Sequence, residues 1–361
     1  MSKTVSSRAL TFDDVLIKPA FSGIASRSNI DISTSLQNLK MSLPIFSAPM
    51  DSVTEWELAS KMILDGGGAL IHRYNSPEKQ SEQVKKTLYS ARDVFDCNSQ
   101  FIFGITVGVK SLSDNQKRIA FSLLEIENAL GKIAYNECLN KFIVCIDVAH
   151  GDHINVHNAT KEIKKEFPNL TLCAGNICTK AAALRYEDAG VNIIKCGIGP
   201  GATCSTRSTT GCGYPQLSTI IEIASATSLP IIADGGIKNS GDIVKALAAG
   251  ADAVMIGSLF SSCPESCAQQ IQDEKGHKFK IYRGMASYSA KADNKIKDTY
   301  VEGESIIKPM SEELDKVIKR LEAGIRSGFS YVGAKNVEEL RSKAEFVEVS
   351  NGTQLENSIR S

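Results

Sequence analysis

The sequence has no net charge that would draw it to a polyanion or a membrane surface. Its 361 residues contain 41 lysines and arginines against 41 aspartates and glutamates, so no basic field favours nucleic acid. No apolar run approaches the roughly 20 residues of a membrane-spanning helix, and Met1–Val5 lacks the apolar core of a secretory signal. We therefore expect neither nucleic acid nor membrane as a partner, and a cytoplasmic location.

The spacing that zinc sites and disulfide frameworks require is also missing. No pair among the ten cysteines has the two-residue gap of a zinc knuckle. Several, such as Cys145 and Cys173, lie inside apolar runs, where a thiol packs as a small hydrophobic group. His153 and His157 are four residues apart but have no evident third ligand. We expect them to be a solvated or capping pair rather than a metal site.

Apolar, β-branched runs recur along the chain with helix-like segments between them. The eight predicted strands are Leu43–Met50, Gly68–His72, Phe101–Val109, Phe142–Ala149, Leu170–Gly175, Ile193–Gly197, Pro230–Ala233 and Ala253–Gly257. The predicted helices are Glu55–Leu64, Pro77–Ser90, Asp114–Leu130, Ala159–Glu166, Lys180–Ala189, Gln216–Ala226, Gly241–Ala249 and, after the strands, Glu312–Ser327. Uniformly apolar strands suit a parallel sheet covered on both faces. The α/β series predicts a closed (β/α)8 TIM barrel, with an open doubly wound sheet as the alternative.

Two segments lie outside the eight β-α units. Residues 1–42 form an N-terminal arm, and residues 259–310 form an insertion after the last strand. The sequence of the insertion predicts a hairpin at Gln269–Tyr282, and the insertion also has a lysine-rich polar stretch at Lys291–Thr299 that is typical of a mobile flap. Because no domain-sized linker interrupts the chain, we predict a single TIM-barrel domain over residues 1–361.

One glycine-rich loop holds the best candidate for a nucleophile. Three glycines fall within the five positions of Gly197–Gly201, and Cys204 follows them among small residues. The loop leaves a predicted strand at its carboxyl end, where such barrels place their chemistry. Backbone amides around the sulfur, with Arg207 nearby, would favour a thiolate. We predict that Cys204 is a nucleophile; the alternative is a cysteine that merely packs.

Glycines also follow the last two predicted strands. Asp234-Gly235-Gly236 comes after the seventh strand and Gly257-Ser258 after the eighth, the place where these barrels often hold a phosphate. Glycine permits close approach of phosphoryl oxygens to backbone amides. Asp234 would instead accept hydrogen bonds from sugar hydroxyls, because a carboxylate repels phosphate. Tight turns that need glycine are the alternative.

Six motifs spread along nearly the whole chain carry a family resemblance. They are Leu10–Leu16, Ser47–Thr54, Gly197–Arg207, Gly213–Gln216, Ala233–Gly236 and Tyr282–Met285. Together they resemble the purine-nucleotide family of inosine monophosphate (IMP) dehydrogenase and guanosine monophosphate (GMP) reductase. The glycine-rich cysteine loop is highly specific for this family.

Within the family, the short flap resembles that of the reductase. Only 16 residues separate Met285 from Glu302, and they lack the Arg-Tyr pair with which the dehydrogenase activates water. Val301–Ser305 resembles the Glu-Gly segment of the reductase, whereas Ala48–Asp51 resembles the dehydrogenase. The strand spacing leaves no room for the regulatory repeats of most dehydrogenases. We expect an NADPH-dependent GMP reductase that yields IMP and ammonia. The alternatives are an IMP dehydrogenase without the repeats, using NAD, and a nucleotide-binding barrel without turnover.

The resemblance implies a covalent mechanism. Cys204 would attack C2 of the guanine ring while Thr206, polarised by Glu302, helps to protonate the departing ammonia. A nicotinamide would then reduce the thioimidate left on Cys204. The nucleotide would be bound by Asp234, Gly235, Gly236, Gly257, Ser258, Gly284, Met285, Ala286 and Gly303.

The resemblance also implies cofactor, cation and subunit contacts. The dinucleotide would meet Ser26, Arg27, Arg73, Asp147, Val148, Ala149 and Met285. Arginine suits a 2′-phosphate and therefore favours NADPH. A potassium ion would be held by carbonyl groups of Gly199, Gly201 and Cys204, with Arg207 nearby. The N-terminal arm would reach a neighbouring subunit, so we expect a homotetramer.

Overall fold

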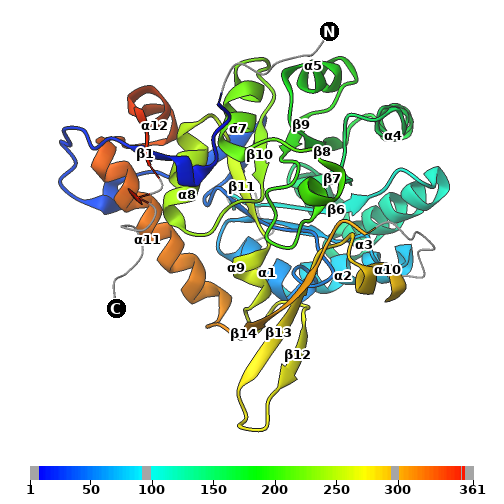
Figure 1. Ribbon diagram of the computed structural model, residues 1–361. Coiled ribbons are helices and arrows are strands. Elements are labelled where there is room, and N and C mark those ends of the chain that lie inside the picture. The colour runs from blue at the N-terminus through cyan, green and yellow to red at the C-terminus, as the bar shows by residue number, and fades with distance from the viewer. Residues whose placement is uncertain (1–7, 92–98, 294–300, 351, 354–361) are drawn as a thin grey trace.

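The computed structural model describes residues 8–91, 99–293, 301–350 and 352–353, and its centre is a closed barrel of parallel strands (Figure 1). The barrel strands in order are β4 (Ile45–Ser47), β5 (Gly68–Ile71), β6 (Ile102–Val107), β7 (Phe142–Asp147), β8 (Thr171–Ile177), β9 (Ile193–Cys196), β10 (Ile231–Asp234) and β11 (Ala253–Ile256). The pairing of β11 with β4 closes the ring. The predicted (β/α)8 TIM barrel is therefore confirmed, and the open sheet is excluded.

The strand bounds differ from the prediction by a few residues. The largest difference is at Leu43–Met50, which shortens to β4. Pro44 and Pro49 flank this strand, and proline cannot donate a hydrogen bond to a ladder.

Helices follow the strands and cover the outside of the barrel (Figure 1). They are α1 (Trp56–Leu64), α2 (Pro77–Ser90), α3 (Leu112–Leu139), α4 (Ile154–Glu166), α5 (Lys180–Asp188), α7 (Gln216–Ala224) and α8 (Ser240–Ala248), with short α6 (Thr206–Thr210) and α9 (Ser258–Ser261) in the loops after β9 and β11. In α2, the Ser76 side chain accepts a hydrogen bond from the Lys79 amide at the N-cap and Pro77 opens the first turn. The predicted bounds of α2 are confirmed. In α3, Gly131 leaves the helical conformation with φ of 73°, directly after the predicted end at Leu130.

Alternate residues of each strand pack into two separate apolar clusters. In β9, Ile194 and Cys196 face the surrounding helices, whereas Ile193 faces the barrel interior. The interior cluster also contains Leu36, Leu39 and Met41 from the hairpin of β2 (Thr34–Leu36) and β3 (Leu39–Met41). This hairpin fills the amino end of the barrel. The barrel interior is thus a packed core rather than a pore.

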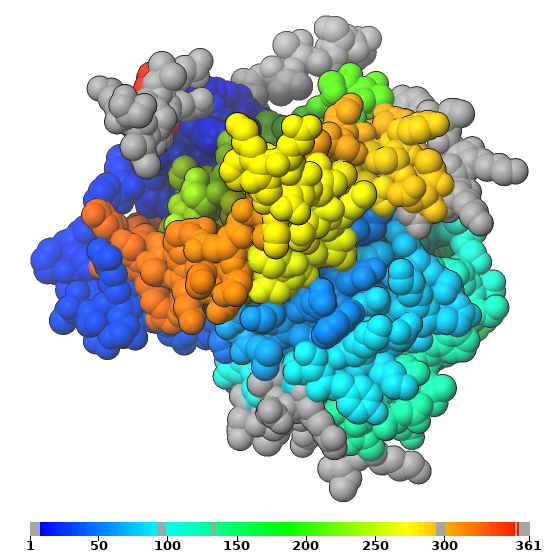
Figure 2. Space-filling view, turned by 90° about the horizontal axis from the view of Figure 1, so that it is seen from below, coloured from blue at the N-terminus to red at the C-terminus, as the bar shows by residue number. Residues whose placement is uncertain are grey.

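The insertion after β11 forms a three-stranded antiparallel sheet of β12 (Gln269–Gln272), β13 (Lys278–Arg283) and β14 (Ser305–Pro309). The predicted hairpin is confirmed, with Gly276 at φ of 86° in its turn. Strand β14 is absent from the prediction. In Figure 2 the hairpin (yellow) lies at the centre of the view, with α11 (Leu314–Val332, orange) to its left. Residues 291–293 of the predicted flap belong to α10 (Tyr288–Asp293), and its residues 294–299 lie outside the described residues.

A strand from the first part of the described chain pairs with a strand from its last part. Strand β1 (Val15–Ile17) pairs antiparallel with β15 (Phe346–Glu348), and α12 (Val337–Lys343) precedes β15. The predicted final helix extends to Val332 in α11. Among the described residues, no helix is both long and apolar enough to cross a membrane.

Substitution of one glycine, Gly104, tests how tightly neighbouring barrel strands are packed. A Cβ atom added at Gly104, in β6, would lie 2.0 Å from the carbonyl oxygen of Ile143 in β7. Because that neighbour is backbone, Gly104→Ala should lower the free energy of unfolding by about 3 kcal/mol. Chemical denaturation of Gly104→Ala, beside Gly23→Ala, measures the effect. No atom lies within 4 Å of an added Cβ at Gly23, and equal midpoints for the two variants would contradict the prediction.

Candidate active site at the carboxyl end of the barrel

A cavity of about 480 Å3 lies at the carboxyl ends of the strands. The predicted site residues that line it are Arg73, Asp147, Val148, Ala149, Gly199, Gly201, Cys204, Thr206, Asp234, Gly235, Gly236, Gly257, Ser258, Gly284, Met285, Ala286 and Glu302. A cavity where separate loops bring polar groups together is the natural candidate for a binding site.

Three side chains in the cavity form a continuous hydrogen-bonded path. The Sγ atom of Cys204 lies 3.1 Å from Oγ1 of Thr206, and this hydroxyl donates to Oε2 of Glu302 over 2.8 Å. Thr206 is the first residue of α6 and is buried, whereas Cys204 is exposed to the cavity. The path can carry a proton between the thiol and the carboxylate.

Glu302 reaches this path because its segment pairs with the cysteine loop. The Ser205 amide donates to the Glu302 carbonyl over 3.1 Å, and the Glu304 amide donates to the Thr203 carbonyl over 2.8 Å. A Cβ added at Gly303 would lie 3.0 Å from a backbone nitrogen of the facing loop. The absence of a side chain at Gly303 therefore lets this segment lie between the loop that carries Cys204 and the loop that carries Ser287.

Cys204 is exposed, whereas most other thiols of the described chain are buried or partly buried. Burial raises the pKa of Cys138 to about 12 and also raises the pKa of Cys196 and Cys267. The exposed thiols among the described residues are Cys204 and Cys212, and of these Cys204 lines the cavity. The predicted nucleophile is thus accessible to a ligand.

The predicted phosphate loops lie together on one side of the cavity. Gly235 and Gly236 have φ of 91° and 82°, a conformation that favours glycine. Lys308 of β14 donates to Oγ of Ser258 over 3.1 Å, and the Tyr282 hydroxyl lies against Gly257. Neither Lys308 nor Tyr282 was singled out for this site from the sequence.

The floor of the cavity holds a buried lysine between two carboxylates. The ammonium of Lys195, in β9, lies 2.7 Å from Oδ1 of Asp147 and 2.7 Å from Oδ2 of Asp234, and it donates to Oδ1 of Asn176. Burial lowers the pKa of Lys195, but the two carboxylates outweigh burial and raise it well above its ordinary value. Lys195 is therefore a cation. The sequence signal for this cluster is a lysine inside an otherwise apolar strand, Ile193–Cys196.

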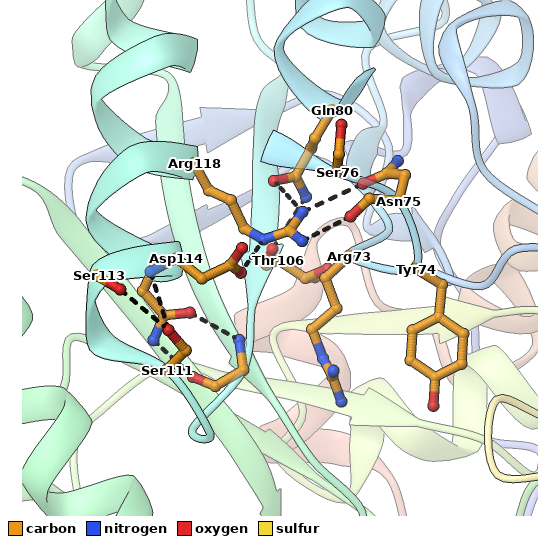
Figure 3. Close-up of polar contacts among 12 residues, drawn as sticks. Arg73, Tyr74, Asn75, Ser76, Gln80, Thr106, Ser111, Ser113, Asp114 and Arg118 are labelled. Carbon is orange, nitrogen blue, oxygen red and sulfur yellow. Dashed lines mark hydrogen bonds and ion pairs between the residues drawn. The ribbon is translucent and has the colours of Figure 1, made fainter. Parts of the chain in front are cut away.

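The loop after β5, which contributes Arg73 and Tyr74 to the cavity wall, is held in place by contacts with α3 (Figure 3). Arg118 of α3 donates to the Asn75 carbonyl and to Oδ2 of Asp114, both over 2.6 Å. Figure 3 shows the side chains of Arg73 and Tyr74 extending away from this cluster. Nε of Arg73 donates to the Asp147 carbonyl over 3.2 Å, and the Tyr74 hydroxyl donates to the Met285 carbonyl over 2.6 Å. The loop thus connects two parts of the cavity wall.

Four predicted site residues, Ser26, Arg27, Arg207 and Gly303, are not part of the cavity wall. Ser26 and Arg27 are exposed and belong to a short helical turn at Arg27–Asn29 that contacts α11. The Arg207 guanidinium donates to the Tyr214 carbonyl over 2.7 Å rather than to the Cys204 thiol. Within one chain the structure does not bring Ser26 or Arg27 to the predicted cofactor side.

Two predictions about cations and histidines can be compared with the structure. Among the described residues, no hydrogen bond reaches the carbonyl oxygens of Gly199 and Cys204, which leaves them able to bind a cation. The described part of the chain holds no group of three or more His, Cys, Asp or Glu suited to a metal. Nδ1 of His153 accepts from the Asn155 amide over 3.1 Å at the start of α4. The expected capping role is thus confirmed for His153.

Comparison with known proteins shows which family this chain resembles. Residues 9–359 match the family model described as IMP dehydrogenase / GMP reductase domain. A relative from Borreliella burgdorferi is 33% identical over 408 residues, covering 99% of this chain and 98% of the relative. Relatives from Haemophilus influenzae (31% identical, 99% and 97% covered) and Bacillus subtilis (30%, 95% and 93%) are similar. All three are named inosine-5′-monophosphate dehydrogenase. These names favour the dehydrogenase alternative over the expected reductase.

Proposed function

The chain belongs to the IMP dehydrogenase / GMP reductase family of oxidoreductases, and from this premise we propose that it converts GMP to IMP and ammonia with NADPH. The hydrogen-bonded path from Cys204 through Thr206 to Glu302 supports covalent chemistry at a purine carbon. The flap sequence supports the reductive direction.

The first half of the reaction forms a covalent adduct. The Cys204 thiol passes its proton through the Thr206 hydroxyl toward Glu302, and the sulfur forms a bond to C2 of the guanine ring. The 2-amino group is a poor leaving group, so it must be protonated before its bond to C2 breaks. The same path returns the proton to the departing nitrogen. Ammonia leaves, and a thioimidate remains on Cys204.

The second half of the reaction breaks the carbon–sulfur bond. The nicotinamide, when bound, supplies the hydride that C2 accepts. The electron pair of the C–S bond then returns to Cys204, which leaves as thiolate and releases IMP. Asp147, Val148 and Ala149 line the wall along which the dinucleotide would lie.

The observation that favours the reductive direction is an absence in the flap sequence. A dehydrogenase must hydrolyse its adduct and therefore needs a base for water. Residues 286–301 contain no arginine, so the Arg-Tyr pair of the dehydrogenase has no counterpart there. Protonation of an amine, by contrast, needs only the Thr206–Glu302 pair.

The second candidate is an IMP dehydrogenase that uses NAD, and the names of the three relatives favour it. In that reaction hydride leaves C2 first, and water attacks the adduct. Thr206 and Glu302 could accept the proton of that water. Two of these relatives align over 461 and 476 residues with this chain of 361, so they hold residues that have no counterpart here.

One spectroscopic experiment separates the candidates. Absorbance of reduced nicotinamide is followed with GMP plus NADPH in one cell and with IMP plus NAD in another. The proposal expects a fall in the first cell, with ammonia formed in equal amount, and no change in the second. A rise in the second cell alone would establish the dehydrogenase. Binding of GMP with no change in either cell would indicate a barrel without turnover.

The remaining contacts follow the family resemblance. Asp234 would bind the ribose hydroxyls, and the turns at Gly235, Gly236 and Gly257 would bring backbone amides to the phosphate. Carbonyl groups of the loop Gly199–Cys204 would bind potassium. Ser26 and Arg27 do not line this chain's own cavity, which is consistent with their donation to a neighbouring subunit of a homotetramer.

Arg73 provides a test of the expected preference for NADPH. Its side chain lines the cavity beside Asp147 and is anchored through Nε. Because a guanidinium pairs with the oxygens of a 2′-phosphate, Arg73→Gln should raise KM for NADPH about tenfold and leave KM for NADH unchanged. Steady-state kinetics with both cofactors measure this. Lys110→Gln, at an exposed position after β6, is the control, and equal KM changes for both cofactors in Arg73→Gln would contradict the prediction.

A further inference from the structure

The cluster around Lys195 joins the two halves of the cavity. Asp234 ends β10 on the side of the phosphate loops, and Asp147 ends β7 on the side of Arg73. One buried ammonium contacts an oxygen of each carboxylate over 2.7 Å. The two carboxylates are partly exposed to the cavity, at 19% for Asp147 and 23% for Asp234, whereas Lys195 is 2% exposed. The carboxylates therefore offer a ligand far more surface than the lysine does.

The ammonium has no proton to spare for chemistry. Its three N–H groups match three acceptors, namely Asp147, Asp234 and Oδ1 of Asn176. Nδ2 of Asn176 donates in turn to Oδ2 of Asp234 over 2.9 Å and to the Gly197 carbonyl over 2.7 Å. These contacts fix one oxygen of Asp234. Its Oδ1 atom has no hydrogen bond among the described residues and remains able to accept one from a ligand.

On this basis we infer that Lys195 is a positioning residue that holds Asp147 and Asp234 in their ligand-binding orientations and so couples nucleotide binding to dinucleotide binding. The inference rests on the proposed function, because it assigns Asp234 to the nucleotide and Asp147 to the cofactor. Without the cation, two carboxylates at the floor of the cavity repel each other. One would turn away or bind a proton, and each ligand would lose a preorganised acceptor.

The test compares Lys195→Met with a double variant. Lys195→Met keeps an apolar chain of similar length and removes the charge. It should weaken GMP binding, measured by calorimetry without cofactor, about tenfold or more, and raise KM for NADPH in parallel. Adding Asp147→Asn removes one of the two repelling charges. GMP affinity should then return to near the native value, while KM for NADPH stays high.

Lys280→Met is the matched control. Lys280 is also buried, but its ammonium donates to the carbonyl groups of Pro264, Ser266 and Ala268 near the hairpin. Its loss should lower the melting temperature and leave both ligand affinities unchanged. A merely structural role for Lys195 would give the same result as Lys280→Met, with no recovery in the double variant.

The outcomes distinguish failure of the proposed function from failure of the role inferred for Lys195. Native protein that binds neither GMP nor IMP would overturn the proposed function itself. Native protein that binds GMP, beside Lys195→Met that binds it equally well, would overturn only the role of Lys195. If Lys195→Met does not fold, the double variant carries the test. A folded double variant with near-native GMP affinity supports the inference, and an unfolded or non-binding one overturns it.

Discussion

Cys204→Ala should abolish turnover while the protein still binds its nucleotide. The sulfur forms the covalent bond to the purine in either direction of the reaction, so its loss should lower kcat by about a thousandfold or more. The side chain is exposed at the cavity wall, and its removal leaves the turns at Gly235, Gly236 and Gly257 intact. Calorimetric affinity for GMP should therefore change little.

The second exposed cysteine supplies the control for this result. Cys212 is outside the cavity lining, so Cys212→Ala should turn over at the native rate. Mass spectrometry of the acid-quenched native enzyme should find a nucleotide adduct on a peptide containing Cys204. Turnover without any such adduct, or an active Cys204→Ala variant, would contradict the covalent mechanism.

Glu302→Gln should slow the release of ammonia far more than it weakens GMP binding. The Glu302 carboxylate accepts the Thr206 hydroxyl over 2.8 Å, and an amide cannot take up the proton that this hydroxyl carries. General acid–base catalysis typically contributes a factor of 10² to 10⁴, so we expect a fall of about a hundredfold. A single-turnover assay of ammonia formation measures the step directly.

Glu304→Gln is the neighbouring control. The Glu304 side chain is exposed and has no hydrogen bond among the described residues. Its substitution should leave ammonia release near the native rate. If Glu302→Gln released ammonia as fast as Glu304→Gln, the proton would have to travel by a route other than Thr206.

The sequence predicted the barrel because its helices and strands are determined largely by neighbouring residues, through helix caps and apolar runs. Helix α2 begins at Pro77 and ends at Ser90 as expected, since its cap and first proline are neighbours in sequence. The uniformly apolar strands likewise predicted the parallel sheet. Strand β14 escaped prediction because its partner β13 is more than 20 residues away in sequence, and an edge strand with exposed Ile307 has no burial pattern of its own.

The site residues also differ in whether the local sequence around them could predict their role. The glycine-rich loop itself predicted Cys204, whereas the roles of Thr206 and Glu302 came from the family resemblance, because nothing local connects Glu302 to the cysteine. Lys195 was passed over because an isolated lysine has no motif around it. Its meaning comes from Asp147 and Asp234, which are brought to it by β7 and β10.

The hairpin of β2 and β3 at the amino end of the barrel has a consequence for ligand traffic. With Leu36, Leu39 and Met41 packed inside that end, reactants cannot arrive from one side while products depart from the other. Both ligands exchange through the same opening near Cys204. The product bound nearer the opening must then leave before the product bound deeper in the barrel. The deeper product should therefore block rebinding of its own substrate until it has left, and inhibit the enzyme by doing so.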